Sequence, residues 1–381
     1  MVRLVLRQLL HERFTTLLFL LCFGLLAALP LGLHRLVGRL EEGMTERAER
    51  SPLLLGRRGG QLQLVLAALH FRGAAPEALT FGDFENLSER WRGAMVPLHL
   101  GGSLAQRPLI GTDPSYFEFR GLHLARGSAF ALLGELVLGA EAAEELEVQV
   151  GTLLRADTGG AFDLTRSEVP ALAVVGILAK SATADDGAVF ADLSTAWMVE
   201  GLLHGHAGAG SDPAAIDRSD DRTVVYSPLL PTATAIDPTE LSAFHLHLEP
   251  ESAPLHAILL EGTDQAEETM LLADLDRDER LFAVRPVEVV EELLALVFRV
   301  REAFDLVLAA VFCAVAMLLS VVVLLSWRVR REEFALFETL GAPKGFAATL
   351  VALQLLVLLL AGTALAAVLV EVLARGFERG W

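Results

Sequence analysis

The chain has 381 residues, of which 53% are hydrophobic, and a formal net charge of −18. Its mean hydropathy of +0.48 is too high for an ordinary soluble protein. Most of the acidic excess lies between Glu41 and Glu292, which argues against a nucleic acid as the partner of that region. The two cysteines, Cys22 and Cys313, fall in apolar stretches, so we expect no disulfide framework.

Three apolar stretches have about the 20 residues that a helix needs to cross the hydrocarbon core of a bilayer. They occupy positions 14–33, 303–327 and 345–371. The sequence therefore predicts an α-helical membrane protein with three spans. Three arginines precede the first stretch, as in a signal peptide. That stretch is longer than a signal core and lacks a cleavage site, so we expect it to be retained.

Basic residues set the predicted orientation, because short loops rich in Arg and Lys stay in the cytoplasm. This rule places the N-terminal segment 1–13 and the loop 328–344 inside the cell. Residues 34–302 then form a large domain on the far side of the membrane, which is the periplasm in a Gram-negative cell. The C-terminal tail, 372–381, lies on that side as well.

The outer domain mixes strand patterns with helix patterns, so we expect an α+β fold. Alternating apolar residues predict strands at 174–178, 189–190, 223–226 and 244–248. Helical spacing predicts helices at 140–150 and 267–276. Charged helical patterns at 35–50 and 286–302 predict stalk helices at both ends of the domain. A Gly-, Ala-, Asp- and Ser-rich segment, 204–222, predicts an exposed loop.

The loop after the second apolar stretch reads RREEFALFETLGA from Arg330 to Ala342. It resembles the signature R-R-x-E-[IF]-x-[LT]-x-x-x-[LM]-G-A of the MacB/FtsX-type ABC permeases. The order of helix, outer domain, stalked helix, loop and helix is similar to that family throughout. Segments within the outer domain also resemble one subgroup of these permeases, at 111–117, 119–121, 188–193, 196–197 and 204–206.

The resemblance implies a MacB-like periplasmic domain and a coupling helix that sits on a separate ATPase subunit, in a mechanism called mechanotransmission. The residues that match the coupling helix are Arg330, Arg331, Glu332, Phe334, Leu336, Phe337, Glu338, Leu340, Gly341 and Ala342. On a helical wheel its two phenylalanines and Leu340 share one side, which suits a docking groove. The alternative is an ordinary interfacial loop whose charges only fix topology.

The chain itself is not expected to be an enzyme. A phosphate-binding loop needs a Gly-rich turn followed by Lys and Ser or Thr, and neither Lys180 nor Lys344 has that setting. ATP and Mg²⁺ are therefore expected on a partner subunit. The other expected partners are a second copy or a homologous permease, a periplasmic protein and the lipid bilayer, but no nucleic acid. Relatives generally carry a fourth membrane helix, so we expect a three-span variant or a fourth helix from a partner.

Two pairs of histidines with i, i+2 spacing stand out in the outer domain, His204 with His206 and His245 with His247. Paired imidazoles suit zinc or copper, and we take His204 and His206 as the candidate zinc ligands. Surface histidines alternating with buried leucines are the alternative. Motifs of hydrolytic catalysis are absent from the sequence, and Asp185-Asp186 sits in a turn-like context that needs no chemical explanation.

These observations predict the membrane subunit of an ABC system, which couples ATP hydrolysis on another chain to a conformational change of its periplasmic domain, for export or transenvelope work. The alternative is a membrane-anchored periplasmic receptor or scaffold, with a metal-related role and without transport. The expected location is the inner membrane of the cell, with multiple passes.

Overall fold

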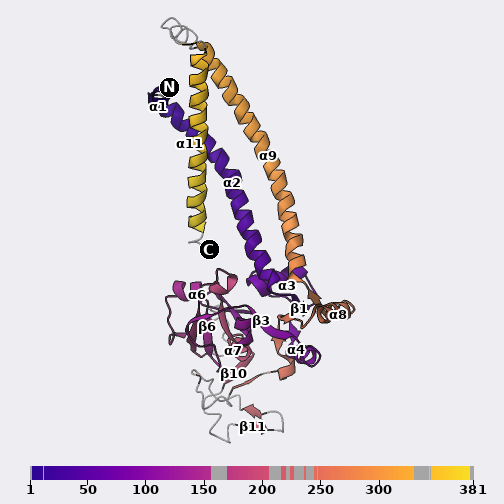
Figure 1. Cartoon of the computed structure of the whole chain (residues 1–381). Coiled ribbons are helices and arrows are strands. Elements are labelled where there is room, and N and C mark those ends of the chain that lie inside the picture. The colour runs from indigo at the N-terminus through magenta and orange to yellow at the C-terminus, as the bar shows by residue number, and fades with distance from the viewer. Residues whose placement is uncertain are drawn as a thin grey trace. The chain divides into compact units, whose positions relative to one another are not determined.

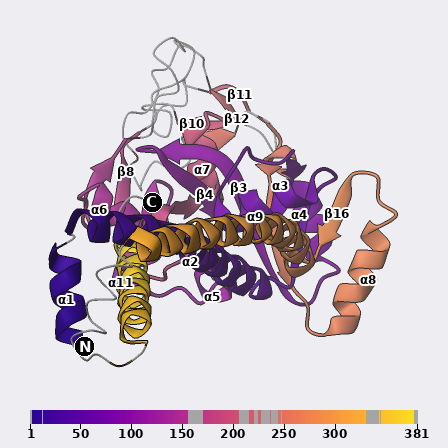
Figure 2. The same ribbon diagram turned by 90° about the horizontal axis from the view of Figure 1, so that it is seen from above.

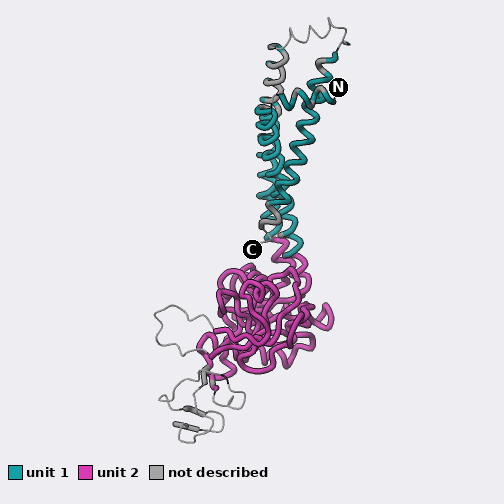
Figure 3. The backbone as a smooth tube through the Cα atoms, turned by 90° about the vertical axis from the view of Figure 1, so that its left-hand side faces the viewer, with its two compact units in different colours: residues 1–43, 293–381 teal, residues 44–292 magenta. Residues whose placement is uncertain are grey.

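A computed structural model describes residues 2–11, 13–155, 170–205, 216–219, 224–226, 236, 244–246, 248–329, 343 and 345–377. The chain divides into two compact units, coloured in Figure 3. The first comprises residues 1–43 and 293–381, and the second comprises residues 44–292. The helices α2 and α9 each contain residues of both units.

The first unit is built from long helices. They are α1 (Val2–His11), α2 (Arg13–Glu49), α9 (Pro286–Val329) and α11 (Phe346–Phe377), labelled in Figure 1. Within the described residues, two helical segments are long and apolar enough to cross a membrane, Thr16–Glu49 in α2 and Thr349–Val372 in α11. The third predicted stretch, 303–327, lies inside the continuous helix α9.

Glycines allow α2 and α11 to pack closely. A Cβ added to Gly362 would meet the ring of Phe23 at 2.5 Å, and one added to Gly24 would meet Leu365 at 2.9 Å. Small residues at such contacts let helix backbones approach in a membrane, where packing replaces the hydrophobic effect. The centre of the Phe23 ring also lies 6.0 Å from that of the Phe312 ring in α9. Phe23 of α2 therefore contacts both α11 and α9.

The second unit contains a ten-stranded sheet with the order β16-β1-β15-β3-β4-β9-β6-β8-β5, and β7 pairs with β8 off this path. The strands are β1 (Leu53–Arg57), β3 (Ala94–Leu104), β4 (Arg107–Thr112), β5 (Leu124–Gly127), β6 (Glu135–Leu138), β7 (Leu153–Leu154), β8 (Leu172–Leu178), β9 (Val189–Asp192), β15 (Ala257–Glu261) and β16 (Leu281–Val284). Two-stranded sheets pair β2 (Leu79–Thr80) with β14 (Pro254–Leu255), β10 (Leu203–Gly205) with β13 (Phe244–Leu246), and β11 (Ile216–Ser219) with β12 (Val224–Tyr226).

The long strand β3 divides the large sheet into two halves. Residues 94–98 of β3 pair with β15, whereas residues 99–104 pair with β4. We call β16, β1, β15 and the start of β3 the first sheet half. The end of β3 with β4, β9, β6, β8 and β5 is the second sheet half. The pairs β4 with β9 and β6 with β8 are parallel, so the sheet is mixed.

Short helices accompany the sheet. They are α3 (Gln61–His70), α4 (Phe81–Ser88), α5 (Ser115–Phe119), α6 (Ala140–Glu145), α7 (Leu193–Val199) and α8 (Gln265–Leu275). Among them, α4, α7 and α8 begin at side-chain caps. Thr80 and Asp83 form a capping box at α4, and Asp192 caps α7 through the amides of Ser194 and Thr195. Figure 2 shows α8 beside β16 at one end of the domain.

The predicted mixed α and β character of the outer domain is confirmed, and strands occur in all four predicted places. Two local predictions were wrong. The helix expected over 140–150 ends at Glu145, because Glu147 takes a positive φ of 53° that stops helical continuation. The segment 204–222, expected to be a loop, contains strand residues at 204–205 and 216–219, since His204 pairs with His245 and Ile216 with Tyr226; its other residues lie outside the described part of the chain.

Candidate functional site

The site residues chosen from the sequence are only partly described. The coupling residues Arg330, Arg331, Glu332, Phe334, Leu336, Phe337, Glu338, Leu340, Gly341 and Ala342 lie outside the described residues, as does His206. His204 lies in β10, where its backbone pairs with that of His245 in β13. In the part of the chain that the structure describes, no three His, Cys, Asp or Glu side chains are arranged to hold a metal ion.

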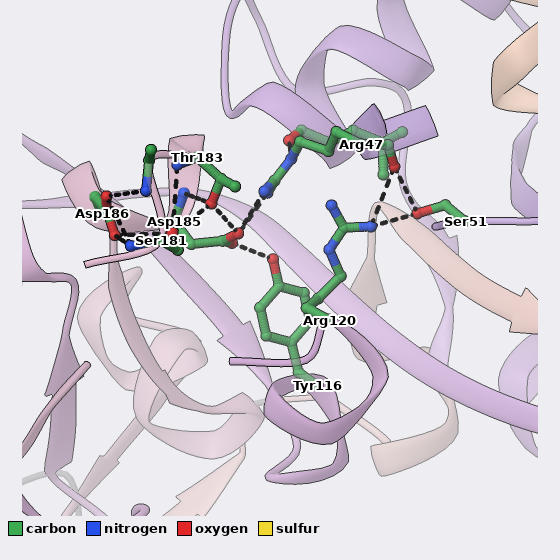
Figure 4. A network of polar contacts seen from close by, with 10 residues as sticks. Arg47, Ser51, Tyr116, Arg120, Ser181, Thr183, Asp185 and Asp186 are labelled. Atoms are coloured by element: carbon green, nitrogen blue, oxygen red, sulfur yellow. Dashed lines mark hydrogen bonds and ion pairs between the residues drawn. The ribbon is translucent and has the colours of Figure 1, made fainter. Parts of the chain in front are cut away.

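A buried polar cluster joins the end of α2 to the outer domain (Figure 4). Its centre is Arg47, which lies in the last turn of α2 and has only 3% of its surface exposed. The guanidinium donates to both carboxylate oxygens of Asp185, at 2.9 Å from Nη2 to Oδ1 and closer from Nη1 to Oδ2. Its Nε donates to the backbone oxygen of Leu69 in α3, and the guanidinium lies 5.4 Å from the centre of the Phe71 ring. The Arg47 side chain thus contacts two other segments at once, η1 and the C-terminal end of α3.

Asp185 comes from η1 (Ala184–Gly187), a short 3-10 helix between β8 and β9. Besides Arg47, it accepts hydrogen bonds from the hydroxyl of Tyr116, at 2.5 Å, and from that of Thr183, at 2.8 Å. Tyr116 lies on α5, and its ring packs 5.3 Å from the ring of Phe190 on β9. This packing holds the phenol in place beneath the carboxylate, as the close view in Figure 4 shows for the labelled pair.

A second arginine, Arg120, follows α5 and reaches back to the chain that leaves α2. Its Nη1 donates to the hydroxyl of Ser51 and, at 3.4 Å, to the backbone oxygen of Arg47. Ser51 is fully buried and lies two residues before β1. Helix α5 is therefore tied to the α2–β1 connection from two sides, by Tyr116 through Asp185 and by Arg120 directly.

Asp186 supports this cluster without contacting Arg47. Its carboxylate accepts from the amide and hydroxyl of Ser181 and from the amide of Ala182, at 2.7 to 3.1 Å. These bonds fix the turn that presents Asp185. Gly139, just before α6, lets this turn approach closely, because a Cβ there would lie 2.1 Å from the backbone oxygen of Asp185.

The charges in the cluster stabilise one another against burial. Desolvation alone would raise the pKa of Asp185, but its bonds and charge interaction with Arg47, together with Tyr116, lower the pKa to about 2. Burial lowers the pKa of Arg47, yet the contacts with Asp185 and Tyr116 outweigh it and leave the pKa above its ordinary value. Burial raises the pKa of the Tyr116 hydroxyl, which stays protonated as a donor. Because its charges are already paired, the buried cluster serves to hold the end of α2 against η1 and α5.

We call Arg47, Ser51, Tyr116, Arg120 and Asp185 the clamp. It joins the end of α2 to α5 and η1, and these elements flank β4 and β9 of the second sheet half. The first sheet half is joined to the helices through the chain itself, because β1 follows α2 and β16 precedes α9. The clamp therefore connects the end of α2 to a part of the sheet to which α2 is not adjacent in sequence.

Sequence reasoning missed the clamp. Asp185 and Asp186 were interpreted as part of a turn that needs no chemical explanation. They do lie in the short 3-10 helix η1, but both are 1% exposed, and their carboxylates accept hydrogen bonds from several groups. A signal was present, because Tyr116 and Arg120 belong to segments chosen for their resemblance to a subgroup of permeases, and Phe190 belongs to a third. What was lacking was a reason to connect them with a basic residue on the first helix.

The domain that contains most residues of the clamp matches a known family. Residues 58–221 match the family described as MacB-like periplasmic core domain. The comparison with curated proteins found no match. Among solved structures, the periplasmic region of MacB from Actinobacillus actinomycetemcomitans is 12% identical, with 66% of this chain and 97% of that chain covered and a TM-score of 0.36. The extracellular domain of the ABC-type transporter YknZ from Gram-positive bacteria is 11% identical, with coverages of 61% and 98% and a TM-score of 0.32.

Residues 58–221 of the second unit thus match a MacB-like periplasmic core domain, which is the domain that the resemblance implied. The described residues also include two helical segments that are long and apolar enough to cross a membrane.

Proposed function

We propose that this chain is the permease subunit of an ABC system that converts ATP hydrolysis by a separate subunit into a conformational change of the outer domain. The observation that carries the proposal is the MacB-like core domain inserted between helices of membrane-spanning length. In this scheme ATP and Mg²⁺ bind to the partner, and this chain transmits force.

Three spans are proposed, in α2, α9 and α11, and the ends of α2 and α9 nearest the outer domain serve as the stalk. The packing of Phe23 on Phe312 supports the inclusion of α9, because it links that helix to the bundle of α2 and α11. Two passes, to the outer domain and back, place loop 328–344 in the cytoplasm of an inner-membrane protein. A second copy or a homologous permease completes the assembly.

The clamp has a defined task in this proposal. A displacement of α2 relative to α9 acts on different parts of the sheet, since α9 continues from β16 whereas Arg47 holds η1 and α5. The outer domain then changes shape instead of moving as one body. The conformational change acts on an exported molecule or on a periplasmic protein partner.

Zinc binding by His204 and His206 is a separate proposal, and calorimetry of the full chain with zinc tests it.

The experiment is co-purification of this chain with an ABC ATPase subunit that is expressed together with it. Leu336→Asp or Phe337→Asp should abolish the association, because a charge enters the apolar docking stripe. Ala335→Asp is the matched control, since it adds the same charge away from the stripe and should retain the ATPase. If the ATPase stays bound to all three variants, the coupling loop is wrongly assigned. If no ATPase binds the wild-type chain, the receptor or scaffold alternative is favoured.

A further inference from the structure

His99, Glu200 and His256 form a second polar cluster, at the point where the two sheet halves meet. His99 is the first residue of β3 that pairs with β4, directly after the residues that pair with β15. His256 lies between β14 and β15, and Glu200 directly follows α7. The cluster therefore brings together elements of both sheet halves.

Both ring nitrogens of His99 face oxygen atoms. Nδ1 lies 2.8 Å from the backbone oxygen of Pro254, and Nε2 lies 3.0 Å from Oε2 of Glu200. The second contact lacks the direction of a hydrogen bond, so it is electrostatic. A neutral imidazole would turn a lone pair towards one of these oxygens, whereas the imidazolium has an N–H on each nitrogen. Because His99 is only 1% exposed, the geometry favours a positive charge opposite the Glu200 carboxylate.

His256 is the neutral member of the pair. Its Nδ1 accepts a hydrogen bond from the amide of Leu100 at 2.9 Å, so this nitrogen carries no proton. Burial, together with the charge of His99, lowers the pKa of His256 to about 4. The two rings lie 4.7 Å apart, close enough for two positive charges to repel. Two titratable groups of the described residues therefore contact His99, the neutral imidazole of His256 and the carboxylate of Glu200.

The surroundings are shaped to hold the Glu200 carboxylate. A Cβ added to Gly101 would lie 2.6 Å from Oε1 of Glu200, so glycine at this position makes room for it. Trp197 on α7 donates from Nε1 to the same oxygen of Pro254, at 2.9 Å, and its ring meets the His99 ring edge-on at 6.4 Å. Helix α7 thus rests on His99 through both an aromatic ring and a charge.

We propose that His99 and Glu200 form a proton-dependent latch that holds the end of α7 on strand β3, at the point where the two sheet halves meet. The latch is closed while His99 carries its second proton. When the proton leaves Nε2, the carboxylate faces a buried lone pair and attraction becomes repulsion. Helix α7 is then less firmly held on the shared strand β3. The relevant signal is the pH outside the membrane, and only this location rests on the proposed function.

The test uses the full chain in detergent with Trp327→Phe and Trp381→Phe, so that Trp91 and Trp197 report on the outer domain. Unfolding by urea is followed at pH 5.5 and pH 8. Glu200→Gln should increase the unfolding equilibrium constant about tenfold at pH 5.5 and leave it unchanged or lower at pH 8, because the amide can donate to a neutral imidazole. Glu261→Gln, an exposed residue of β15, is the matched control and should have no pH-dependent effect.

A second variant removes the contact without removing a charge. Gly101→Ala displaces the carboxylate and should reproduce the pH-dependent loss of Glu200→Gln. In the wild type, imidazole nitrogen shifts of His99, assigned with His99→Asn, should change from imidazolium at pH 5.5 to neutral at pH 8. Equal effects of Glu200→Gln at both pH values, or a His99 that stays neutral at pH 5.5, would overturn the latch. Neither readout involves an ATPase, so failure of the latch leaves the proposed permease function standing.

Discussion

Replacing Arg47 by Met should strongly destabilise the outer domain. The change removes the charge opposite Asp185, whose carboxylate is 1% exposed and would keep only the hydroxyls of Tyr116 and Thr183. Breaking one side of a buried ion pair costs about 3–5 kcal/mol, because the other charge stays buried without compensation. The depressed pKa of Asp185 agrees in direction and is equivalent to about 2 kcal/mol in favour of its charged form.

The assay is urea unfolding of the full chain in detergent, followed by the emission of Trp91 and Trp197 after Trp327→Phe and Trp381→Phe. Asp185→Leu should lower the free energy of unfolding by a similar amount. The double variant Arg47→Met/Asp185→Leu should lose about 2 kcal/mol less than the sum of the two single losses, because the two residues interact. Arg50→Met is the control, since this exposed arginine forms a surface ion pair with Glu46 and its replacement should change the free energy of unfolding by less than about 1 kcal/mol. If Arg47→Met lowers the free energy of unfolding no more than Arg50→Met does, the clamp does not stabilise the outer domain.

Three further results are expected from the same assay or close relatives of it. Tyr116→Phe should cost about 1.5–3 kcal/mol, because a buried carboxylate loses a donor while the ring keeps its packing; a cost near zero would mean that the hydroxyl is not needed. The pKa values of His70 and His256 in the folded chain are both about 4, below the ordinary 6.5. The unfolded chain therefore binds protons more readily than the folded chain. The free energy of unfolding should fall as the pH drops from 6.5 to 4, by up to about 3 kcal/mol for each histidine. In the Glu200→Gln variant, which lacks the latch, a stability that is level or rises between pH 7 and pH 4.5 would contradict this. Gly362→Val should force α11 away from Phe23 and cost about 1–3 kcal/mol of packing, measured as a lower midpoint of thermal aggregation, whereas an unchanged midpoint would argue against the close contact.

The parts of the fold that depend on local pattern could be predicted from the sequence. Apolar stretches of sufficient length marked the helices α2 and α11, and alternating residues marked strands such as β8 and β9. Helix ends were less accessible, as α6 shows, because a single residue with positive φ decides where a short helix stops. The order of strands in the sheet depends on contacts distant in sequence, and no local pattern encodes it.

The buried polar clusters were beyond sequence reasoning for a different reason. Arg47 and Asp185 are 138 positions apart, and each taken alone has the composition of a solvated surface residue. His99 and Glu200 likewise carry no motif, and the notable histidine pairs of the sequence, at 204–206 and 245–247, drew attention elsewhere. Only the fold reveals that a basic residue at a helix end and an acidic turn are buried together.

The central claim is that the loop after α9 faces the cytoplasm, where a motor subunit can reach it, while the outer domain faces the other side. Cysteine labelling with an impermeant reagent in intact cells tests it directly, after Cys22 and Cys313 have been replaced by alanine. Glu118→Cys, at an exposed position of α5, should be labelled from outside, and Thr339→Cys only after the membrane is permeabilised. Labelling of Thr339→Cys in intact cells would contradict the account.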